Sequence, residues 1–591
     1  MLNANRGFLS LQISMTLTLI VFLTYLFSVV SLYVGLGVNN FIFPFSFLAG
    51  TAIGLLIPIR RDNIFFKNGR PLLLFTVFCI TAVSLRVGET LYDYSYDGLR
   101  YHQNTIAALL NGWNPLNMES DPNAPSYLWS LHYAAGIEIC EAAISSFAGR
   151  IEAGKGLNLI AVFAALTAVY GVLRNCGREI FFRDSKHSFG RKQLRVAEEE
   201  REEREERDER EEVKEKIEDG REKIEEAGFG WKKALLLSVA IVGNPVVTLQ
   251  LFIYYIDFYK YLYLLLFLVG IVLLSSSRER ISMFGCMMTG MTLILAMASK
   301  FNFFFEAGVW VLLALVWCII RKKWLCFRRL LTVSVISLVI GLFLTIHPYY
   351  INLIDYGHPF YPLMGEGAVD IMNYNTPEIY DGHNRIVNFF YSLIKLSIPN
   401  YDQREGGFTI LMPFILLLSL FIIIRNRKSI RPVIIYLYVW IILSCFFFEQ
   451  SWWARYITQL WLAGGIGAII GIAAEKRRTA GCILSWIMIA VTLSTGALSL
   501  GGSIRKGGYI KSMLNTCSYQ PVTLSGTVFP QVKRHLDENG IYYRMVSSPD
   551  SVEGVAYSYY SGYPPVIILS ARQAERLREN KGLLGDSRER Y

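Results

Sequence analysis

The chain has 591 residues, of which 53% are hydrophobic, 14% aromatic and only 18% charged, and its mean hydropathy is +0.35. This composition excludes an ordinary soluble globular enzyme and predicts a polytopic membrane protein. The formal charge is +10, although residues 198–226 alone hold 17 acidic and 8 basic side chains. The remaining positive excess is typical of cytoplasmic loops beside anionic lipid, so we expect no nucleic-acid partner.

Thirteen apolar segments are long enough, or nearly so, to cross a bilayer, which takes a helix of about 20 residues. They are 8–34, 41–59, 71–88, 157–173, 234–253, 261–274, 281–298, 303–320, 331–346, 408–424, 432–448, 457–474 and 481–500. The first is too long for a signal-peptide core and shows no small-residue cleavage site, which indicates an uncleaved span.

Lysine and arginine collect in alternate short loops, which predicts that these loops face the cytoplasm. The basic loops are 60–70, 278–280, 321–329, 425–431 and 476–478. The two long segments between other spans, 89–156 and 347–407, then face outward. The prediction is a protein of the cell (inner) membrane with a cytoplasmic N-terminus and an extracytoplasmic C-terminus.

Residues 133–149 are also apolar, but a span there would invert everything downstream. Glu138 and Glu141 would each cost about 3 kcal/mol at mid-bilayer. We therefore expect an amphipathic helix lying in the outer interface.

Two polar pieces lie outside the spans. Residues 195–226 are dense in opposite charges at helical spacing, which favours a solvated cytoplasmic helix, either a spacer or a docking helix. The tail predicts a helix at 530–538, strands at 541–546 and 566–569, and a final helix opened by a Ser570–Gln573 capping box.

The predicted fold class is therefore an all-α polytopic membrane protein of about 13 transmembrane helices. Interfacial helices lie in its first outer loop, and a small α/β extracytoplasmic domain follows at the C-terminus. The expected division is 1–70, two N-terminal spans; 71–500, the catalytic module; and 501–591, the tail domain.

The first outer loop carries the most informative residues. Apolar positions at helical spacing predict a helix over 99–111, with Asp97 capping its start and Asn111-Gly112 ending it. Asp97 would then stand at the mouth of the helix bundle. It is either a simple helix cap or a carboxylate exposed at the bilayer edge as a general base.

The order of the polar residues along the chain resembles a known family. Asp97-Gly-Leu-Arg-Tyr101-His102 with Gly112-Trp113 is similar to the first loop of the GT-C superfamily of polyprenyl-phosphate-sugar-dependent glycosyltransferases, near its protein O-mannosyltransferase and aminoarabinose transferase branch. Further similar features are Tyr254-Tyr-Ile-Asp257, Ala298-Ser-Lys300, Gly357-His-Pro-Phe-Tyr-Pro362 and Trp452-Trp-Ala-Arg455-Tyr456. The resemblance covers roughly residues 71–500.

The resemblance implies an integral membrane glycosyltransferase that moves a sugar from a polyprenyl-phosphate donor to a glycan, lipid or protein acceptor on the outer face, with inversion. Asp97 would be the general base and His102 would tune it. The donor phosphate would be bound by cations chosen from Arg455, Lys300, His132 and Arg404. Acceptor or substrate contacts would come from Asp257, Asp93, Tyr101 and Trp453.

Simpler interpretations of these residues stay open. Arg455 is equally an interfacial anchor beside its tryptophans, Lys300 a snorkelling lysine, His102 a surface histidine and Asp257 half of an ion pair. A divalent cation as cofactor also stays open, because family members often carry two adjacent acids, whereas Gly98 follows Asp97 here.

Two other functions share the composition. A flippase or transporter of lipid-linked glycans would show broken helices and charged residues at the midplane, in two related halves. An outward-facing polysaccharide polymerase or ligase would share the donor and the sidedness.

Overall fold

We analysed a computed structural model of the chain. It describes residues 2–57, 69–116, 124–125, 128–182, 228–369, 375–404, 407–447, 450–474, 478–518, 520–525, 530–547, 553–559 and 565–582. The predicted charged helix 195–226 lies outside the described residues.

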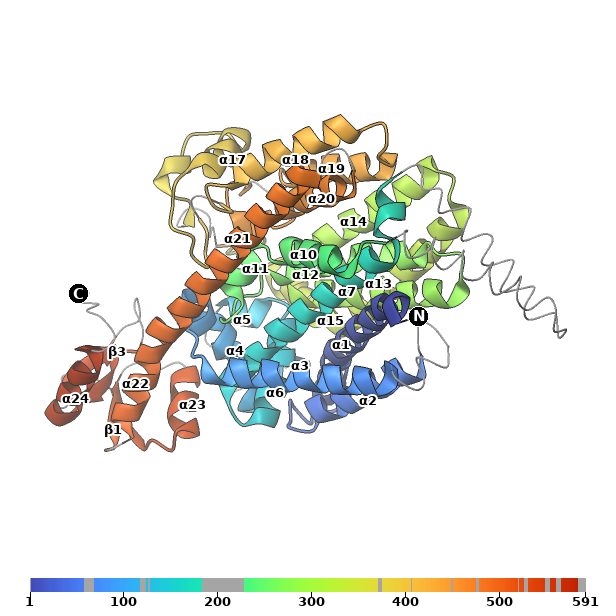
Figure 1. Ribbon diagram of the computed structural model, residues 1–591. Helices are drawn as coiled ribbons and strands as arrows, with labels where there is room; N and C mark the ends of the chain where they lie inside the picture. Colours follow the sequence, from blue (N-terminus) through green and yellow to red (C-terminus); the bar gives the residue numbers. More distant parts are fainter. Residues whose placement is uncertain are drawn as a thin grey trace.

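The described chain is mostly helical (Figure 1). The helices up to the middle of the chain are α1 (Leu2–Tyr33), α2 (Ile42–Leu56), α3 (Arg70–Thr90), η2 (Gly98–His102), α4 (Gln103–Leu110), α5 (Leu128–His132), α6 (Gly136–Ala148), η4 (Ile151–Lys155), α7 (Gly156–Phe181), α10 (Trp231–Val242), α11 (Pro245–Gln250), α12 (Tyr259–Leu274) and α13 (Glu279–Ser299).

The second half adds further helices and a small sheet. These elements are α14 (Phe301–Ile320), α15 (Trp324–Tyr356), η5 (Glu378–Tyr380), α17 (Arg385–Ile394), α18 (Met412–Asn426), α19 (Pro432–Ser444), η6 (Ala454–Tyr456), α20 (Leu460–Ala473), α21 (Arg478–Gly502), η8 (Ser503–Gly507), α22 (Gly508–Cys517), β1 (Val522–Ser525), α23 (Pro530–Glu538), β2 (Tyr543–Val546), β3 (Val555–Ser558), β4 (Pro565–Leu569) and α24 (Ala571–Gly582).

Seven helices among the described residues are long and apolar enough to cross a membrane, and shorter apolar helices lie between them. One predicted span is wrong as a single helix, because 234–253 is divided into α10 and α11. Pro245 has no N–H to continue α10, and Asn244 instead caps α11 by accepting a hydrogen bond from the Val246 amide at 2.9 Å. The structure does not fix the total of about thirteen spans.

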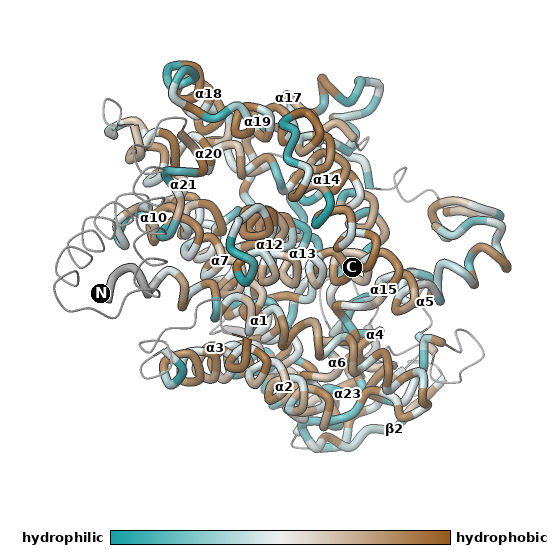
Figure 2. Tube along the Cα trace, turned by 90° about the vertical axis from the view of Figure 1, so that its right-hand side faces the viewer, coloured by the Kyte–Doolittle hydropathy of each residue, from teal (hydrophilic) through white to brown (hydrophobic). Residues whose placement is uncertain are grey.

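Several helices expose apolar surface that a water-soluble protein would bury. Only 17% of the apolar stretch of 324–345 and 22% of that of α14 is buried, against 78% for α1. The tube in Figure 2 is brown along much of α14, α15 and α18, on the outside of the bundle. Exposed apolar faces of this size fit contact with lipid, so the chain is a helical membrane protein.

The bundle is closely packed around α1 and α12. Helix α1 lies against α2, α7 and α6, and α12 lies against α13. A β-carbon on Gly54 would lie 2.2 Å from the Thr16 hydroxyl, and Gln12 Nε2 donates to the Gly54 carbonyl at 2.7 Å. A small residue and a polar bond across the contact are typical of helix pairs in membranes.

Helix α6 corrects the expectation of an amphipathic helix on the surface. It begins at Gly136 and ends at Ala148, too short to span a bilayer, and residues 136–145 are all buried. Glu138 and Glu141 therefore lie inside the protein. Burial raises the pKa of the Glu141 carboxyl well above its ordinary value, which favours its neutral form.

The C-terminal residues form a small sheet with flanking helices, at the end of the long helix α21 (Figure 1). The strand order is β2-β1-β4-β3, with β1 and β2 parallel and the other pairs antiparallel. The predicted helix 530–538 and the two predicted strands are present. The capping box is also confirmed, because the Ser570 amide donates to Gln573 Oε1 at 3.0 Å and the Gln573 amide to Ser570 Oγ at 3.4 Å.

Candidate active site

Arg455 stands at the centre of three carboxylates that come from distant parts of the chain. Its Nη1 lies 3.0 Å from Asp97 Oδ2, 3.4 Å from Asp402 Oδ1 and 3.5 Å from Asp257 Oδ2. Arg455 and Asp97 are 358 positions apart in the sequence. The geometry therefore brings together the early carboxylate and the late guanidinium that the sequence singled out.

Two further cations complete this group. Lys300 Nζ lies 2.9 Å from Asp257 Oδ1, and Arg404 Nε lies 2.5 Å from Asp402 Oδ2. We call these six residues, Asp97, Asp257, Lys300, Asp402, Arg404 and Arg455, the Arg455 cluster. Its three positive and three negative formal charges cancel.

All six residues lie in connections between helices, which places the cluster at one end of the bundle. Asp97 precedes η2, Asp257 precedes α12, and Lys300 is the break between α13 and α14. Asp402 and Arg404 lie between α17 and α18, and Arg455 lies in η6, before α20.

An aromatic wall supports the guanidinium. Arg455 Cζ lies 4.0 Å from the ring centre of Trp453 and 5.6 Å from that of Tyr255, within the range of a cation–π interaction. Trp453 is stacked on Trp452, with ring centres 5.3 Å apart, and its indole N–H donates to the Asp402 carbonyl at 2.6 Å. The Trp453 ring thus supports the guanidinium of Arg455 from one side.

The carboxyl pKa values of the cluster move in opposite directions. Burial alone would raise the pKa of Asp257, but Lys300 and Arg455 outweigh it and lower that pKa to about 2. Burial raises the pKa of Asp402, against the opposing effect of Arg455 and Arg404. Burial lowers and Asp257 raises the pKa of Lys300, with a net rise. Asp257 and Lys300 therefore both stay charged at neutral pH.

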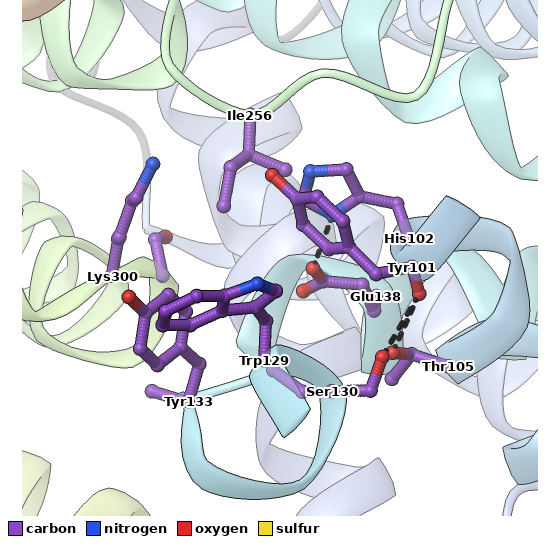
Figure 3. A pocket seen from close by; sticks show the side chains of 12 residues that line it. Tyr101, His102, Thr105, Trp129, Ser130, Tyr133, Glu138, Ile256 and Lys300 are labelled. Carbon is purple, nitrogen blue, oxygen red and sulfur yellow. Dashed lines mark hydrogen bonds and ion pairs between the residues drawn. The ribbon is translucent and has the colours of Figure 1, made fainter. Parts of the chain in front are cut away.

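A cavity adjoins the cluster through Lys300 (Figure 3). Its free space, part of which is open to solvent, is about 350 Å³. Tyr101, Trp129 and Tyr133 line it with their rings, and Ser130 and Glu138 add polar atoms. The close-up shows the Lys300 side chain across the space from the Tyr101 ring.

His102 is paired with a buried carboxylate in the wall of this cavity. Its Nδ1 lies 2.6 Å from Glu138 Oε1, and both side chains are less than one-tenth exposed. Each side chain gives the other a polar partner inside the protein, which a buried polar group needs. The predicted role of His102, tuning Asp97, stays a prediction.

Asp97 does not cap a helix, so that expectation was wrong. Its backbone angles are helical, with φ −64° and ψ −40°, and its side chain makes no capping hydrogen bond. The carboxylate pairs with Arg455 instead. The helix that follows does end as predicted, at Leu110, with Gly112 at φ +96°.

The structure places two predicted site residues away from the Arg455 cluster. Asp93 is fully buried, and its Oδ1 and Oδ2 accept hydrogen bonds from the amides of Ser95 at 2.7 Å and Tyr254 at 2.9 Å. No part of Asp93 is accessible to a substrate, so we withdraw it from the site. His132 is buried with its Nδ1 2.7 Å from Asn352 Oδ1, and its ring is edge-on to the stacked rings of Tyr356 and Tyr361. Its role as a phosphate ligand stays a prediction.

Sequence reasoning missed Asp402 and Glu138. Asp402 is two residues from Arg404, which was singled out, but nothing in a long loop indicates which of its acids turns inward. Glu138 was treated only as a barrier to membrane insertion. A glutamate in an otherwise apolar stretch also indicates a buried partner. In the structure that partner is His102.

The three aspartates of the Arg455 cluster lie around the positively charged side chains of Lys300, Arg404 and Arg455. No group of three or more His, Cys, Asp or Glu is arranged to hold a metal ion in the part of the chain that the structure describes. The mechanism proposed below contains no metal step.

Fold and site together define a helical membrane protein with a neutral ionic cluster at one end of its bundle. No family model matches the sequence, and no curated protein does. Among solved structures, the fold is similar to the crystal structure of ArnT from Cupriavidus metallidurans bound to undecaprenyl phosphate, with a TM-score of 0.43 and 12% identity over 81% of this chain and 86% of that one. This likeness concerns the fold alone.

Proposed function

We propose that the protein is an integral membrane glycosyltransferase that moves a sugar from a polyprenyl-phosphate donor to an acceptor on the outer face of the cell membrane. The observation that carries this proposal is the meeting of Asp97, Arg455 and Lys300 beside an aromatic-lined cavity. A base, two phosphate-binding cations and a pocket lined by aromatic and polar side chains are parts that such a transfer uses.

The cations suit the leaving group. Departure of a polyprenyl phosphate raises the charge on its phosphate from about −1 towards −2, so donors aimed at the leaving oxygen stabilise the transition state. Arg455 Nε is buried and has no hydrogen-bond partner among the described residues, which leaves one N–H for a phosphate oxygen. Lys300 belongs both to the cluster and to the cavity wall and supplies the second donor.

Asp97 is the base in this mechanism. The acceptor oxygen or nitrogen forms a bond to the anomeric carbon as the bond from that carbon to the phosphate oxygen breaks. The electron pair leaves on the phosphate, and the proton of the acceptor passes to Asp97. A single displacement inverts the anomeric centre. The Asp97 side chain is 17% exposed, so it keeps access to an acceptor while Arg455 orients it.

Asp257 holds the cations in place. It bonds Lys300 and lies beside Arg455, so both donors are positioned before the phosphate arrives, which reduces the reorganisation needed during reaction. Its acceptor-binding role, implied by the resemblance, gives way to this positioning role in the proposal.

The cavity suits a sugar ring. Trp129, Tyr133 and Tyr101 offer aromatic faces, and Ser130 and Glu138 offer hydrogen-bonding groups. Faces that pack on C–H groups together with a few directed polar atoms are typical of small polar ligands.

Helix α17 supplies apolar surface next to the cluster, as a lipid donor requires. Ser392 Oγ on its inner side donates to the Trp452 carbonyl at 2.6 Å. Its outer side exposes Ile386, Phe390 and Ile394, each by more than half. A polyprenyl chain lying along this side would bring its phosphate to Arg455.

Binding of undecaprenyl phosphate to the purified protein in nanodiscs tests the donor site. We expect Lys300→Met to weaken this binding at least about tenfold, the loss of one charge-assisted bond. The matched control is Lys323→Met, because Lys323 is an exposed lysine at the other end of α14. Equal binding by both variants and the wild type would refute the donor site.

A further inference from the structure

The C-terminal unit (520–582) shares its hydrophobic core with the loop that carries Asp97. Tyr92 and Leu99, on either side of Asp97, are buried among Val532, Leu536 and Ile567 of that unit. Figure 1 shows the unit attached by α21 and α22 and lying beside α4, with α23 nearest. The unit is thus packed onto the bundle rather than tethered beside it.

Polar contacts from α23 reach the same loop. The side-chain amide of Gln531, fully buried, donates to the Leu99 carbonyl. Glu538 Oε1 accepts from the Ile151 amide at 2.8 Å, and His535 Nε2 lies 3.0 Å from Glu152 Oε1. One face of a nine-residue helix therefore contacts both η2 and η4.

Glu152 extends this contact to residues around Asp97. Its carboxylate accepts from Gln103 Nε2 at 3.0 Å and from the Asp93 amide at 3.2 Å, and it is paired with Lys155. Asp93, Leu99 and Gln103 are therefore all fixed, directly or through Glu152, by groups that α23 touches.

The backbone of residues 98–102, directly after Asp97, needs stabilising contacts from other segments. Residues 98–102 form a single π-helical turn, which is rarely stable by itself and is frequent at functional sites. Gly98 is tightly enclosed, since a β-carbon there would lie 2.0 Å from Asp93 Oδ2. The bond from Gln531 to Leu99 falls inside this turn.

We propose that the C-terminal unit positions Asp97 for the transfer reaction, with Gln531 as the positioning residue. This inference rests on the proposed function. A base must stay within about 0.5 Å of its productive position, and the contacts of α23 restrain the turn next to Asp97. Gln531 itself touches neither substrate nor the Arg455 cluster in this account.

The test compares two buried glutamines in the same unit. Gln531→Met removes the amide that binds Leu99 at nearly constant volume. Gln573→Met removes a buried amide whose contacts stay within the unit itself, since its Nε2 donates to the Gln520 carbonyl at 3.1 Å and its Oε1 accepts from the Ser570 amide in the capping box. Hydrogen exchange of the backbone amides of residues 97–104 and the kinetics of transfer are measured on the full-length protein.

We expect Gln531→Met to speed exchange at residues 97–104 and to lower kcat about tenfold with the donor KM within about twofold. Gln573→Met should leave both unchanged. Unchanged exchange in Gln531→Met, or equal effects of the two variants, would overturn the positioning role. Faster exchange in Gln531→Met alone supports it even if the wild type transfers no sugar, a result that would count against the proposed function only.

Discussion

The role of the Asp97 side chain depends on Arg455. The position of Asp97 before a helix suggests a cap, but a guanidinium 3.0 Å away is a stronger partner than backbone amides. Trp453 stacks on that guanidinium, so the pair is oriented as well as attracted. Position 455 thus calls for a planar cation that can lie over the Trp453 ring.

Arg455→Lys tests this requirement. A lysine keeps the charge but loses the planar group that lies over Trp453 and the Nε–H that is offered to the phosphate. We expect kcat/KM for donor turnover to fall at least about tenfold while the variant still folds. Turnover at the wild-type level, measured as released polyprenyl phosphate, would reduce Arg455 to an interfacial anchor.

The low pKa of Asp257 predicts a pH effect on stability. Its pKa in the folded protein, about 2, lies below the ordinary value of 3.8, so its ion pairs stabilise the fold above about pH 4. That stabilisation is lost as the pH falls towards 2. The melting temperature of the wild type should therefore drop more between pH 5 and pH 3 than that of Asp257→Asn, as followed by tryptophan fluorescence in detergent. Parallel curves would contradict the shift.

At the scale of elements, buried charges tie α12 and α14 to the segment that holds Arg455. Lys260 Nζ on α12 lies 2.8 Å from Glu306 Oε1 on α14 and also donates to the Tyr456 carbonyl. Both side chains are almost wholly buried. Neither residue belongs to the Arg455 cluster, yet their pairing fixes the backbone next to Arg455.

Glu306→Leu should destabilise the protein by about 3–5 kcal/mol, because it removes the carboxylate that pairs with the buried Lys260 ammonium. The double variant Lys260→Met with Glu306→Leu should recover most of this loss. Thermal unfolding of the two variants in the same detergent provides the measurement. If Glu306→Leu is as stable as the wild type, the Lys260–Glu306 pair does not stabilise the fold.

Elements were easier to predict than contacts. The helices could be predicted from long apolar stretches, because membrane insertion depends on the summed hydrophobicity of about 20 residues. The break at Asn244-Pro245 was missed because the apolar stretch continues across it. The burial of α6 was missed because sequence periodicity cannot say whether an apolar face meets lipid or protein.

The site was predictable only in part, for a similar reason. Asp97 was found from its place before a predicted helix, and Asp257, Lys300 and Arg455 from the family resemblance of their motifs; the structure brings the four together. Asp402 and the pair of His102 with Glu138 were missed, because such contacts depend on how α6 and the 357–411 segment fold over the bundle. Asp93 was included wrongly, because its position near Asp97 in the sequence does not show which of the two carboxylates is accessible to a substrate.

For the whole molecule, the charge pattern predicts which way the bundle crosses the membrane. The basic loops should face the cytoplasm and the C-terminal unit the outside. Tyr542 in that unit is 83% exposed, and Ser275, between α12 and α13, is exposed at a predicted cytoplasmic loop. These two positions report the two sides.

A membrane-impermeant maleimide should label Tyr542→Cys in intact spheroplasts and Ser275→Cys only after permeabilisation. The unmodified protein, with its own cysteines, gives the background. The reverse labelling pattern would place the Arg455 cluster on the cytoplasmic side and remove the argument for a lipid-linked donor.

The most direct test of the transferase is the turnover of Asp97→Asn. Membranes from cells that produce the protein supply the acceptor, and release of polyprenyl phosphate from labelled polyprenyl-phosphate sugars is the signal. We expect Asp97→Asn to insert normally and bind undecaprenyl phosphate, yet to release at least about a hundredfold less than the wild type, whereas Asp355→Asn, an exposed carboxylate on α15, releases as much as the wild type. Release by Asp97→Asn at the wild-type rate would contradict the account.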